Sequence, residues 1–235
     1  MKLSVIIPVY KEEATLEEIV GRVRATRLAY EVIVVDDGSP DNSHSILKCL
    51  QYTGYPPLKI LKHERNQGKG AAIRTGLSAV TGDLVLVQDA DLEYDPADYP
   101  LLLAPFDNPA VAVVYGSRNL CKNPKSTSAF YWGGRFLSWV TNCLYGGHIT
   151  DEATGFKVFK AALIKDLNLE GNGFEFCPEV TGKILRRRIA IHEVPISYSP
   201  RTWAEGKKIR WYDGLFALWY LIKYRFCRIS SFNKT

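Results

Sequence analysis

Two aspartates separated by one residue, Asp89 and Asp91, directly follow the apolar run at 84–88 and precede Glu93. Mg²⁺ and Mn²⁺ prefer oxygen ligands, and proteins commonly hold them with one or two carboxylates together with waters and substrate phosphates. We therefore expect Asp89, Asp91 and Glu93 to hold Mg²⁺ or Mn²⁺ beside a bound diphosphate. The alternative is a solvated cluster of loop aspartates, and the strand expected before the cluster argues against it.

A second acidic pair, Asp36 and Asp37, follows another apolar run and precedes Gly38 and Ser39. These residue types also suit a turn that caps a helix, so this segment alone leaves both interpretations open.

A glycine-bearing turn at 65–72 (RNQGKGAA) precedes a stretch that is compatible with a helix. Backbone N–H groups at the start of a helix bind anions, and Lys69 adds a positive charge. We expect this turn to lie beside phosphate groups.

The elements that must position these residues alternate between strand and helix. Short apolar runs rich in β-branched residues predict strands buried on both faces of a parallel sheet, at 3–9, 31–37, 58–61 and 83–88, with helices at 14–27 and 71–80. This alternation predicts an α/β fold with a Rossmann-like, doubly wound, mostly parallel sheet over the first 115 residues. Ligands of such sheets bind at the carboxyl ends of the strands, where both acidic segments fall.

From residue 116 onward the pattern is less regular. It comprises an aromatic segment with glycines, a turn-rich stretch, a helix and an extended run, at 130–147, 150–156, 178–188 and 192–198. We find no repeat and no linker, and so expect this half to extend the same domain.

Four segments in this order carry a resemblance to a known family. They are residues 8–12 (PVYKE), 36–39 (DDGS), the 65–72 turn and the triplet at 89–91 (DAD). Together they resemble the nucleotide-sugar-binding half of the inverting glycosyltransferases of family 2. The resemblance implies a GT-A type fold, a nucleoside diphosphate sugar and Mg²⁺ or Mn²⁺, with a nucleotide pocket at Pro8, Tyr10, Glu12, Asp37, Lys69, Gly70, Asp89 and Ala90.

The second half resembles the dolichol-phosphate mannose synthase and bacterial polyprenyl-phosphate branch of that family. Three segments carry the similarity, at 115–118 (YGSR), 151–157 (DEATGFK) and 194–208, which begins VPISY. The resemblance implies a C-terminal acceptor-binding extension in which the acceptor phosphate is bound by Arg118, Arg135, Arg201, Lys207 and Lys208. Lys207 stands where the branch often has Ser, and this departure leaves the donor and acceptor open.

A polyprenyl phosphate is an anionic acceptor that needs no general base, provided that cations neutralise its charge. The planar guanidinium group suits phosphate oxygens. We therefore expect Asp91, Arg118 and Arg201 to take part in the inverting transfer of a hexose from GDP-mannose or a UDP-hexose. Arg135 interrupts an aromatic stretch, so its charge either reaches solvent or meets phosphate.

Three alternatives stay open. A family 2 enzyme that glycosylates a hydroxyl needs a carboxylate base, for which Asp151 and Glu152 are the candidates. A nucleotidyltransferase also uses an acidic metal site at a strand end, although this sequence lacks a glycine-rich, basic loop after its first strand. A non-catalytic nucleotide-sugar-binding protein is disfavoured because all four nucleotide-side segments are present.

Positive charge gathers near the end of the chain. The net charge is +5, and residues 201–235 hold eight Lys or Arg against Glu205 and Asp213. The stretch at 211–226 is too short and too charged to cross a bilayer core of about 30 Å. Its aromatic and leucine residues do not suit a nucleic-acid-binding arm, so it either lies at an anionic membrane surface or packs as an ordinary helix.

We therefore expect a catalytic domain over 1–210, with a nucleotide-sugar-binding half at 1–115 and an acceptor half at 116–210, and a basic amphipathic, membrane-associating tail at 211–235. The five cysteines show no metal-ligand spacing, and the first residues do not resemble a signal peptide. These features predict a cytoplasmic location at the membrane face rather than secretion. Nucleic acid is not expected as a partner, and the oligomeric state stays open.

Overall fold

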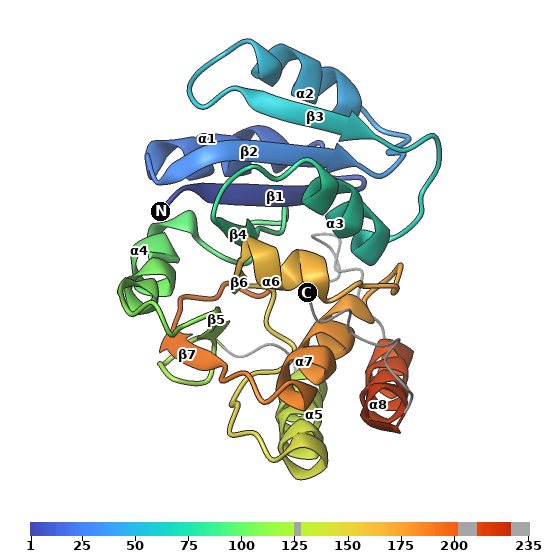
Figure 1. Cartoon of the computed structure of the whole chain (residues 1–235). Helices are drawn as coiled ribbons and strands as arrows, with labels where there is room; N and C mark the ends of the chain where they lie inside the picture. The colour runs from blue at the N-terminus through green and yellow to red at the C-terminus, as the bar shows by residue number, and fades with distance from the viewer. Residues whose placement is uncertain (125–127, 202–210, 227–235) are drawn as a thin grey trace.

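The computed structural model describes residues 1–124, 128–201 and 211–226. Its centre is a seven-stranded sheet with the order β3-β2-β1-β4-β6-β5-β7 (Figure 1). The strands are β1 (Leu3–Val9), β2 (Ala29–Asp36), β3 (Leu58–Lys62), β4 (Leu84–Val87), β5 (Val113–Ser117), β6 (Lys157–Lys160) and β7 (His192–Pro195). Neighbouring strands are parallel except where β6 pairs with β4 and β5. The predicted mostly parallel sheet is confirmed.

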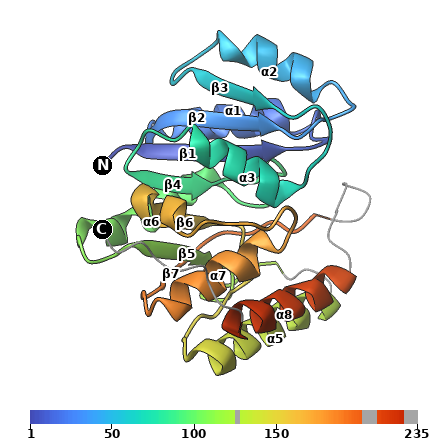
Figure 2. The same cartoon turned by 45° about the vertical axis from the view of Figure 1, so that its right-hand side comes forward.

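Helices cover both faces of the sheet (Figure 2). One face packs against α1 (Leu16–Ala25), α2 (Ser43–Gln51) and α4 (Tyr99–Leu103), and the other against α3 (Lys69–Ser78), α6 (Ala161–Asp166) and α7 (Phe176–Arg186). Short 3₁₀ turns, Pro96–Asp98 and Ala104–Asp107, flank α4.

The apolar run of β1 shows why these strands lie in the middle of the molecule. Val5 and Ile7 belong to the core on the α1 side, whereas Ile6 belongs to the core on the α3 side, and all three are fully buried. Successive side chains of a strand point to opposite faces, so a continuously apolar strand needs a cover on both. This arrangement leaves the carboxyl ends of the strands open for a binding site.

The expected elements form within a few residues of their predicted bounds, and α3 begins at Lys69 rather than at residue 71. The sequence pattern did not indicate α2, nor that β6 would enter the sheet antiparallel between β4 and β5. β6 is a strand of four residues with lysine at each end, too short for a distinctive period.

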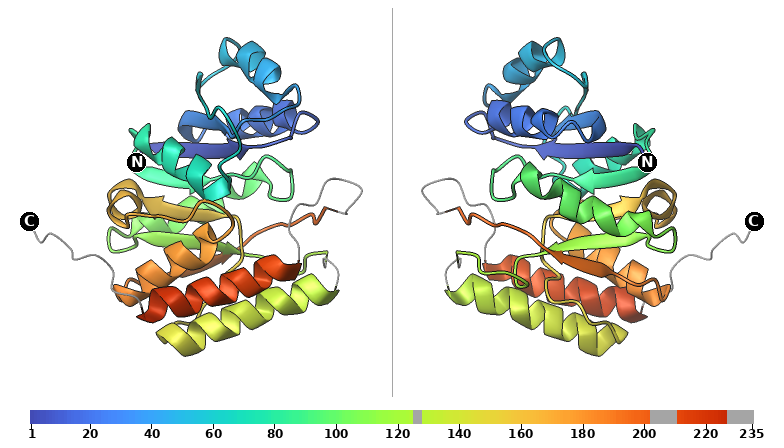
Figure 3. Two further views of the ribbon diagram at one scale, coloured as in Figure 1. Left: turned by 90° about the vertical axis from the view of Figure 1, so that its right-hand side faces the viewer. Right: turned by 90° about the vertical axis from the view of Figure 1, so that its left-hand side faces the viewer.

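Two long helices lie beyond the β7 edge of the sheet. They are α5 (Ser128–Tyr145), which contains the aromatic segment expected at 130–147, and α8 (Trp211–Phe226). They pack against each other side by side, and α7 packs against both (Figure 3). Strands from residues 1–115 and from residues 116–210 share one sheet, so both parts contribute to its carboxyl edge.

Candidate active site

A cavity of about 1070 Å³ lies where β1, β2 and β4 end, and α5, α7 and α8 form its other walls. Its place outside the carboxyl ends of parallel strands follows the general rule for open α/β sheets. Most of the predicted site residues line it, namely Pro8, Tyr10, Glu12, Asp37, Lys69, Asp89, Ala90, Asp91, Glu93, Arg118, Glu152 and Arg201.

Several predicted site residues are not brought to this cavity. Asp151 and Gly70 lie behind its wall, and Arg135 is exposed on α5 outside the lining. The exposure of Arg135 fits the first of its two alternatives, in which the charge reaches solvent, and its assignment to the acceptor phosphate stays a prediction. Lys207 and Lys208 lie outside the described residues.

Asp89 and Asp91 leave the end of β4 and form the acidic centre of the cavity. Asp89 Oδ1 lies 2.6 Å from Lys69 Nζ, at the start of α3. Burial would lower the pKa of Lys69, but the Asp89 carboxylate outweighs this effect and raises the pKa overall. Burial, followed by repulsion from Asp89 and Glu93, raises the pKa of Asp91 to about 7, although Arg201 opposes the rise. The centre thus holds more negative charge than its own cations neutralise.

Glu93 and Arg201 tie the segment after β7 to this centre. Arg201 donates to the Asp91 carbonyl oxygen through Nε at 2.6 Å and to Glu12 Oε2 through Nη2 at 2.8 Å. Glu93 accepts the Arg201 backbone N–H at 2.8 Å through Oε1 and the Tyr198 hydroxyl at 3.1 Å through Oε2. Glu93 therefore anchors residues 198–201.

These contacts limit which residues fit a metal ion. Across the described part of the chain, no group of three or more His, Cys, Asp or Glu side chains is arranged to hold one, so the expected set of Asp89, Asp91 and Glu93 is not assembled. Asp89 and Asp91 remain, and the raised pKa of Asp91 marks a carboxyl group that lacks a compensating cation. Two carboxylates fit Mg²⁺ or Mn²⁺ when a substrate diphosphate supplies further oxygens.

Asp37 lines the cavity but is occupied by donors of the chain itself. Oδ1 accepts from His63 Nδ1 at 2.6 Å and the Gln67 N–H at 2.8 Å, and Oδ2 accepts from Asn66 Nδ2 at 2.9 Å and the Gly68 N–H at 2.8 Å. A carboxylate offers about four acceptor positions, so all of them are filled. Asp37 fixes the 66–68 turn rather than presenting a free acceptor to the cavity.

Several N–H groups of the glycine-bearing turn, which was expected to bind an anion, are used within the chain itself. The Ala71 N–H donates to the Asn172 carbonyl oxygen at 3.0 Å, and the N–H groups of the preceding turn bind Asp37. A Cβ atom at Gly68 or Gly70 would clash with carbonyl oxygens of residues 171–172. The glycines therefore admit a second loop, and the Lys69 side chain carries the positive charge into the cavity.

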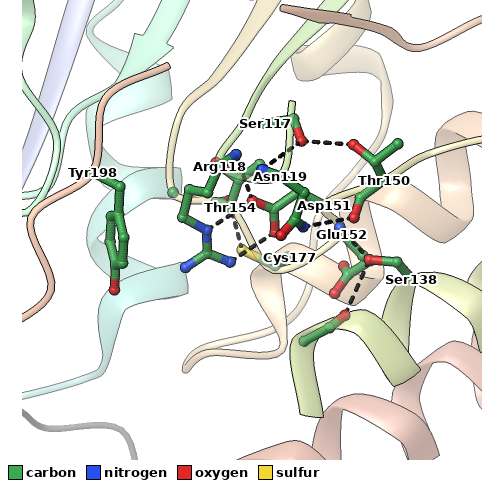
Figure 4. Close-up of polar contacts among 12 residues, drawn as sticks. Ser117, Arg118, Asn119, Ser138, Thr150, Asp151, Glu152, Thr154, Cys177 and Tyr198 are labelled. Atoms are coloured by element: carbon green, nitrogen blue, oxygen red, sulfur yellow. Dashed lines mark hydrogen bonds and ion pairs between the residues drawn. The ribbon is translucent and has the colours of Figure 1, made fainter. Parts of the chain in front are cut away.

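Arg118 is held by Asp151 at the opposite wall (Figure 4). Arg118 Nε and Nη2 each donate to the Asp151 carboxylate at 2.7 Å, and the Arg118 backbone N–H donates to it at 3.0 Å. Glu193 in turn accepts the N–H groups of Thr150 and Asp151 at 2.7 and 3.0 Å. The Arg118 guanidinium carbon also lies 5.0 Å from the centroid of the Tyr198 ring. Asp151 thus orients Arg118, and the Asp151 carboxylate is already engaged by these contacts to Arg118.

Lys157 is a buried cation that the sequence pattern did not single out. Its Nζ donates to the carbonyl oxygens of Glu152 and Thr154 at 2.8 and 2.6 Å and lies 4.5 Å from the Tyr115 ring centroid. An isolated lysine among Phe156, Val158 and Phe159 was the available signal, because a buried ammonium group needs nearby acceptors. Lys157 holds the loop that carries Asp151 and Glu152.

The cavity changes character toward α5 and α8. Its lining there is mainly apolar, from Phe130, Gly133, Gly134, Phe136, Leu137, Gly214, Leu215, Ala217 and Leu218, with Asp213 as the charged member on α8. The same two helices also carry exposed aromatic side chains that do not line the cavity, among them Trp132, Trp139, Phe216, Trp219 and Phe226. Within the described ranges, no helix has both the length and the apolar character needed to cross a membrane.

Comparison with known families identifies this site. The sequence model of Glycosyl transferase family 2 matches residues 4–167, more than half of the chain. The chain belongs to glycosyl transferase family 2. This family 2 membership confirms the resemblance found in the sequence and removes the nucleotidyltransferase alternative.

Curated relatives of this family 2 chain place it in the polyprenyl-phosphate branch, as predicted. It is 30% identical over 216 residues to dodecaprenyl-phosphate galacturonate synthase of Rhizobium johnstonii, covering 86% of this chain and 60% of the relative. It is 30% identical over 229 residues to UDP-N-acetylglucosamine–dolichyl-phosphate N-acetylglucosaminyltransferase of Methanococcus voltae, covering 88% and 90%. Dolichol-phosphate mannosyltransferase of Pyrococcus furiosus is 29% identical, with 88% and 59% covered. The chain thus spans about 60% of two of these relatives.

Solved structures confirm the predicted GT-A type fold. Glucosyl-3-phosphoglycerate synthase from Mycobacterium tuberculosis, in complex with Mn²⁺, UDP and glucosyl-3-phosphoglycerate, superposes with a TM-score of 0.72 at 20% identity, covering 97% of this chain and 81% of that chain. A second complex of that enzyme, with Mg²⁺ and UDP, gives the same TM-score of 0.72.

Proposed function

We propose that this family 2 glycosyltransferase transfers one hexose, with inversion, from a nucleoside diphosphate sugar to a polyprenyl phosphate. The observation that carries the proposal is the two-part cavity, which is charged at the strand ends and apolar between α5 and α8. An acceptor that joins a phosphate to a long apolar chain suits both parts. The names of three relatives each combine a sugar with a dodecaprenyl, dolichyl or dolichol phosphate.

The donor nucleotide is assigned to the strand ends of the first half. Pro8 lies near the end of β1, Tyr10 and Glu12 follow that strand, and Lys69 directs its ammonium group toward Asp89. In this assignment Lys69 lies beside the diphosphate, and Asp37 keeps the 66–68 turn in place instead of reading the base. GDP-mannose and the UDP-hexoses both remain candidate donors.

Asp89 and Asp91 are the residues that would hold Mg²⁺ or Mn²⁺ together with the diphosphate. When bound, the ion supplies positive charge that stabilises the leaving nucleoside diphosphate. Solved structures of the structurally similar synthase are complexes with Mn²⁺ or Mg²⁺ and UDP. The crowded negative charge that raises the pKa of Asp91 supports a divalent cation at this point.

The acceptor phosphate is assigned to Arg118 and Arg201. A phosphate oxygen attacks the anomeric carbon from the face opposite the diphosphate, and the bond to the diphosphate oxygen breaks as the new C–O bond forms. The attacking oxygen carries no proton to remove, so the step needs charge neutralisation rather than a base. The contacts to Asp151 and Glu12 pre-orient the two guanidinium groups for this purpose.

Peripheral membrane contact belongs to the same proposal. The exposed aromatic side chains lie on α5 and α8, the helices that line the apolar part of the cavity. Aromatic residues favour the membrane–water interface, and Lys223 and Arg225 near the end of α8 favour anionic lipid. A lipid acceptor would then reach the apolar part of the cavity directly from the membrane.

The test is to incubate the protein with Mg²⁺ or Mn²⁺, a panel of UDP- and GDP-sugars and a short polyprenyl phosphate, and to identify products by mass. A polyprenyl-phosphate-linked hexose is expected. Parallel reactions with glycans and small alcohols test the hydroxyl-acceptor alternative, for which Glu152 remains the candidate base because Asp151 is paired with Arg118. Transfer to hydroxyl acceptors alone would refute the proposal.

A further inference from the structure

Glu152 is a buried carboxyl group without a role in the contacts described above. Its side chain is 1% exposed, and the residue lines the cavity. Considering the described residues, its Oε1 atom has no hydrogen-bond partner. Leaving a buried polar atom unpaired costs about 1–3 kcal/mol, and a bound ligand that donates a hydrogen bond removes this cost.

The charged groups around Glu152 indicate which kind of ligand group suits it. Lys157 donates to the carbonyl oxygens of Glu152 and Thr154, and Arg118 is engaged by the Asp151 carboxylate. Burial raises the pKa of Glu152, and nearby Lys157 offsets only part of this effect. A neutral donor such as a hydroxyl or amide N–H suits Oε1, whereas an added anion would meet both Glu152 and Asp151.

The loop that carries Glu152 lies between the two ends of the proposed reaction. On one side, a Cβ atom at Gly155 would come within 2.5 Å of Asp89 Oδ2. On the other side, the Glu152 backbone N–H donates to Ser138 Oγ on α5 at 3.0 Å (Figure 4). The group that passes from the diphosphate to the acceptor phosphate is the hexose, and its polar groups other than the reacting centre are neutral in a simple hexose.

We propose that Glu152 selects the donor sugar by accepting, through Oε1, a hydrogen bond from a hydroxyl or amide N–H of a neutral hexose. This inference rests on the proposed function. We expect sugars that carry a carboxylate to be disfavoured, because Lys157 and Arg118 are already engaged by acceptors of the chain and a second anion beside Glu152 and Asp151 would be desolvated without a further cation. Glu152 is thus a specificity residue rather than a general base.

The first test compares kcat/KM for neutral and uronate donors in the wild type, Glu152→Gln, Glu152→Ala and the exposed control Glu18→Gln. We expect the wild type to prefer the neutral donor. Glu152→Ala should lose about 10- to 100-fold with that donor, the range for a hydrogen bond to a charged group. Glu152→Gln keeps an acceptor oxygen and removes the charge, so it should stay within about tenfold on the neutral donor and gain uronate use.

The second test uses monodeoxy versions of the neutral donor. The deoxy sugar that lacks the hydroxyl in contact with Glu152 should give the same kcat/KM with the wild type and with Glu152→Ala. The other deoxy sugars should keep the full difference in kcat/KM between these two proteins. Three results would each overturn the proposal. The first is an equal loss of activity for every deoxy donor, and the second is a preference of the wild type for the uronate donor. The third is a large fall in the kcat of Glu152→Gln with unchanged donor selectivity.

Donor binding without acceptor separates this inference from the proposed function. Saturation-transfer NMR of the sugar protons should show Glu152-dependent contacts even if no polyprenyl phosphate is glycosylated. In that case the acceptor assignment fails while the sugar assignment stands. If polyprenyl phosphate is glycosylated but donor selectivity does not depend on Glu152, the sugar assignment fails while the acceptor assignment stands.

Discussion

Replacing Asp151 with asparagine tests how the cavity holds Arg118. The pair is nearly buried, with Asp151 and Arg118 side chains 1% and 23% exposed. Asparagine keeps one acceptor oxygen but loses the negative charge and one of the paired contacts. Removing one partner of a buried pair costs about 3–5 kcal/mol, and the remaining oxygen reduces this to about 2–4 kcal/mol. For a chain of this size the expected fall in Tm is about 5–15 °C.

The matched control is Asp166→Asn, whose Arg187 partner lies at the same 2.7 Å N–O distance. The Asp166 side chain is 61% exposed, so its loss should change stability by less than about 1 kcal/mol. Thermal unfolding of both variants measures the contrast. Similar Tm values for the two variants would show that burial does not strengthen the Arg118 pair.

The activity of Asp151→Asn distinguishes orientation of Arg118 from general-base catalysis. Misplacing a charge that neutralises the acceptor phosphate should lower kcat/KM for polyprenyl phosphate about 100-fold. Because Asp151 acts through Arg118, the double variant Arg118→Met/Asp151→Asn should be no slower than Arg118→Met alone. Multiplicative losses in the double variant would refute this reasoning and favour Asp151 as a base.

Three further predictions follow from other parts of the site. Asp91 binds a cation as the carboxylate, and its pKa is raised to about 7, so the affinity of the protein for Mn²⁺ should rise from pH 6 to pH 8. The increase in Tm that Mn²⁺ causes should therefore be larger at pH 8 than at pH 6, and it should vanish in Asp91→Asn. Gly68→Ala should lower Tm through about 1–3 kcal/mol of strain, because Gly68 has φ +100° and a Cβ would meet the Asn172 carbonyl oxygen; the exposed Gly21→Ala in α1, whose Cβ meets nothing, should not. Trp139→Glu and Trp219→Glu should each weaken sedimentation with anionic vesicles, whereas Tyr52→Glu, at an exposed aromatic residue just after α2, should not.

The sequence predicted the acidic centre well because one physical rule governs it. The apolar runs at 31–35 and 84–88 identify buried parallel strands, and such strands end at a common edge. Asp37 and Asp89 therefore had to approach the same cavity, and both line it. The same rule explains why Pro8, near the end of β1, and Glu12, just after that strand, reach the cavity with them.

The functions of individual groups were harder to predict, because they depend on partners distant in sequence. Asp37 has four donors from residues 63–68, so a side chain expected in the nucleotide pocket also fixes a turn. The glycines at the start of α3 resemble an anion-binding turn, yet the loop at 171–172 covers them. Hydrogen-bond saturation by a remote loop leaves no local sequence signal.

The pairing of charges gives the site its chemical logic. Three cations that line the cavity and were expected to meet phosphate already have a carboxylate partner, since Lys69 lies beside Asp89, Arg201 beside Glu12 and Arg118 beside Asp151. These pairs fix the cations in a partly buried cavity before any substrate arrives, which lowers the reorganisation that phosphate binding requires. Asp91 differs, because burial and then repulsion from Asp89 and Glu93 raise its pKa to about 7. Bringing a diphosphate to this point adds still more negative charge, so donor binding and binding of a divalent cation should each strengthen the other.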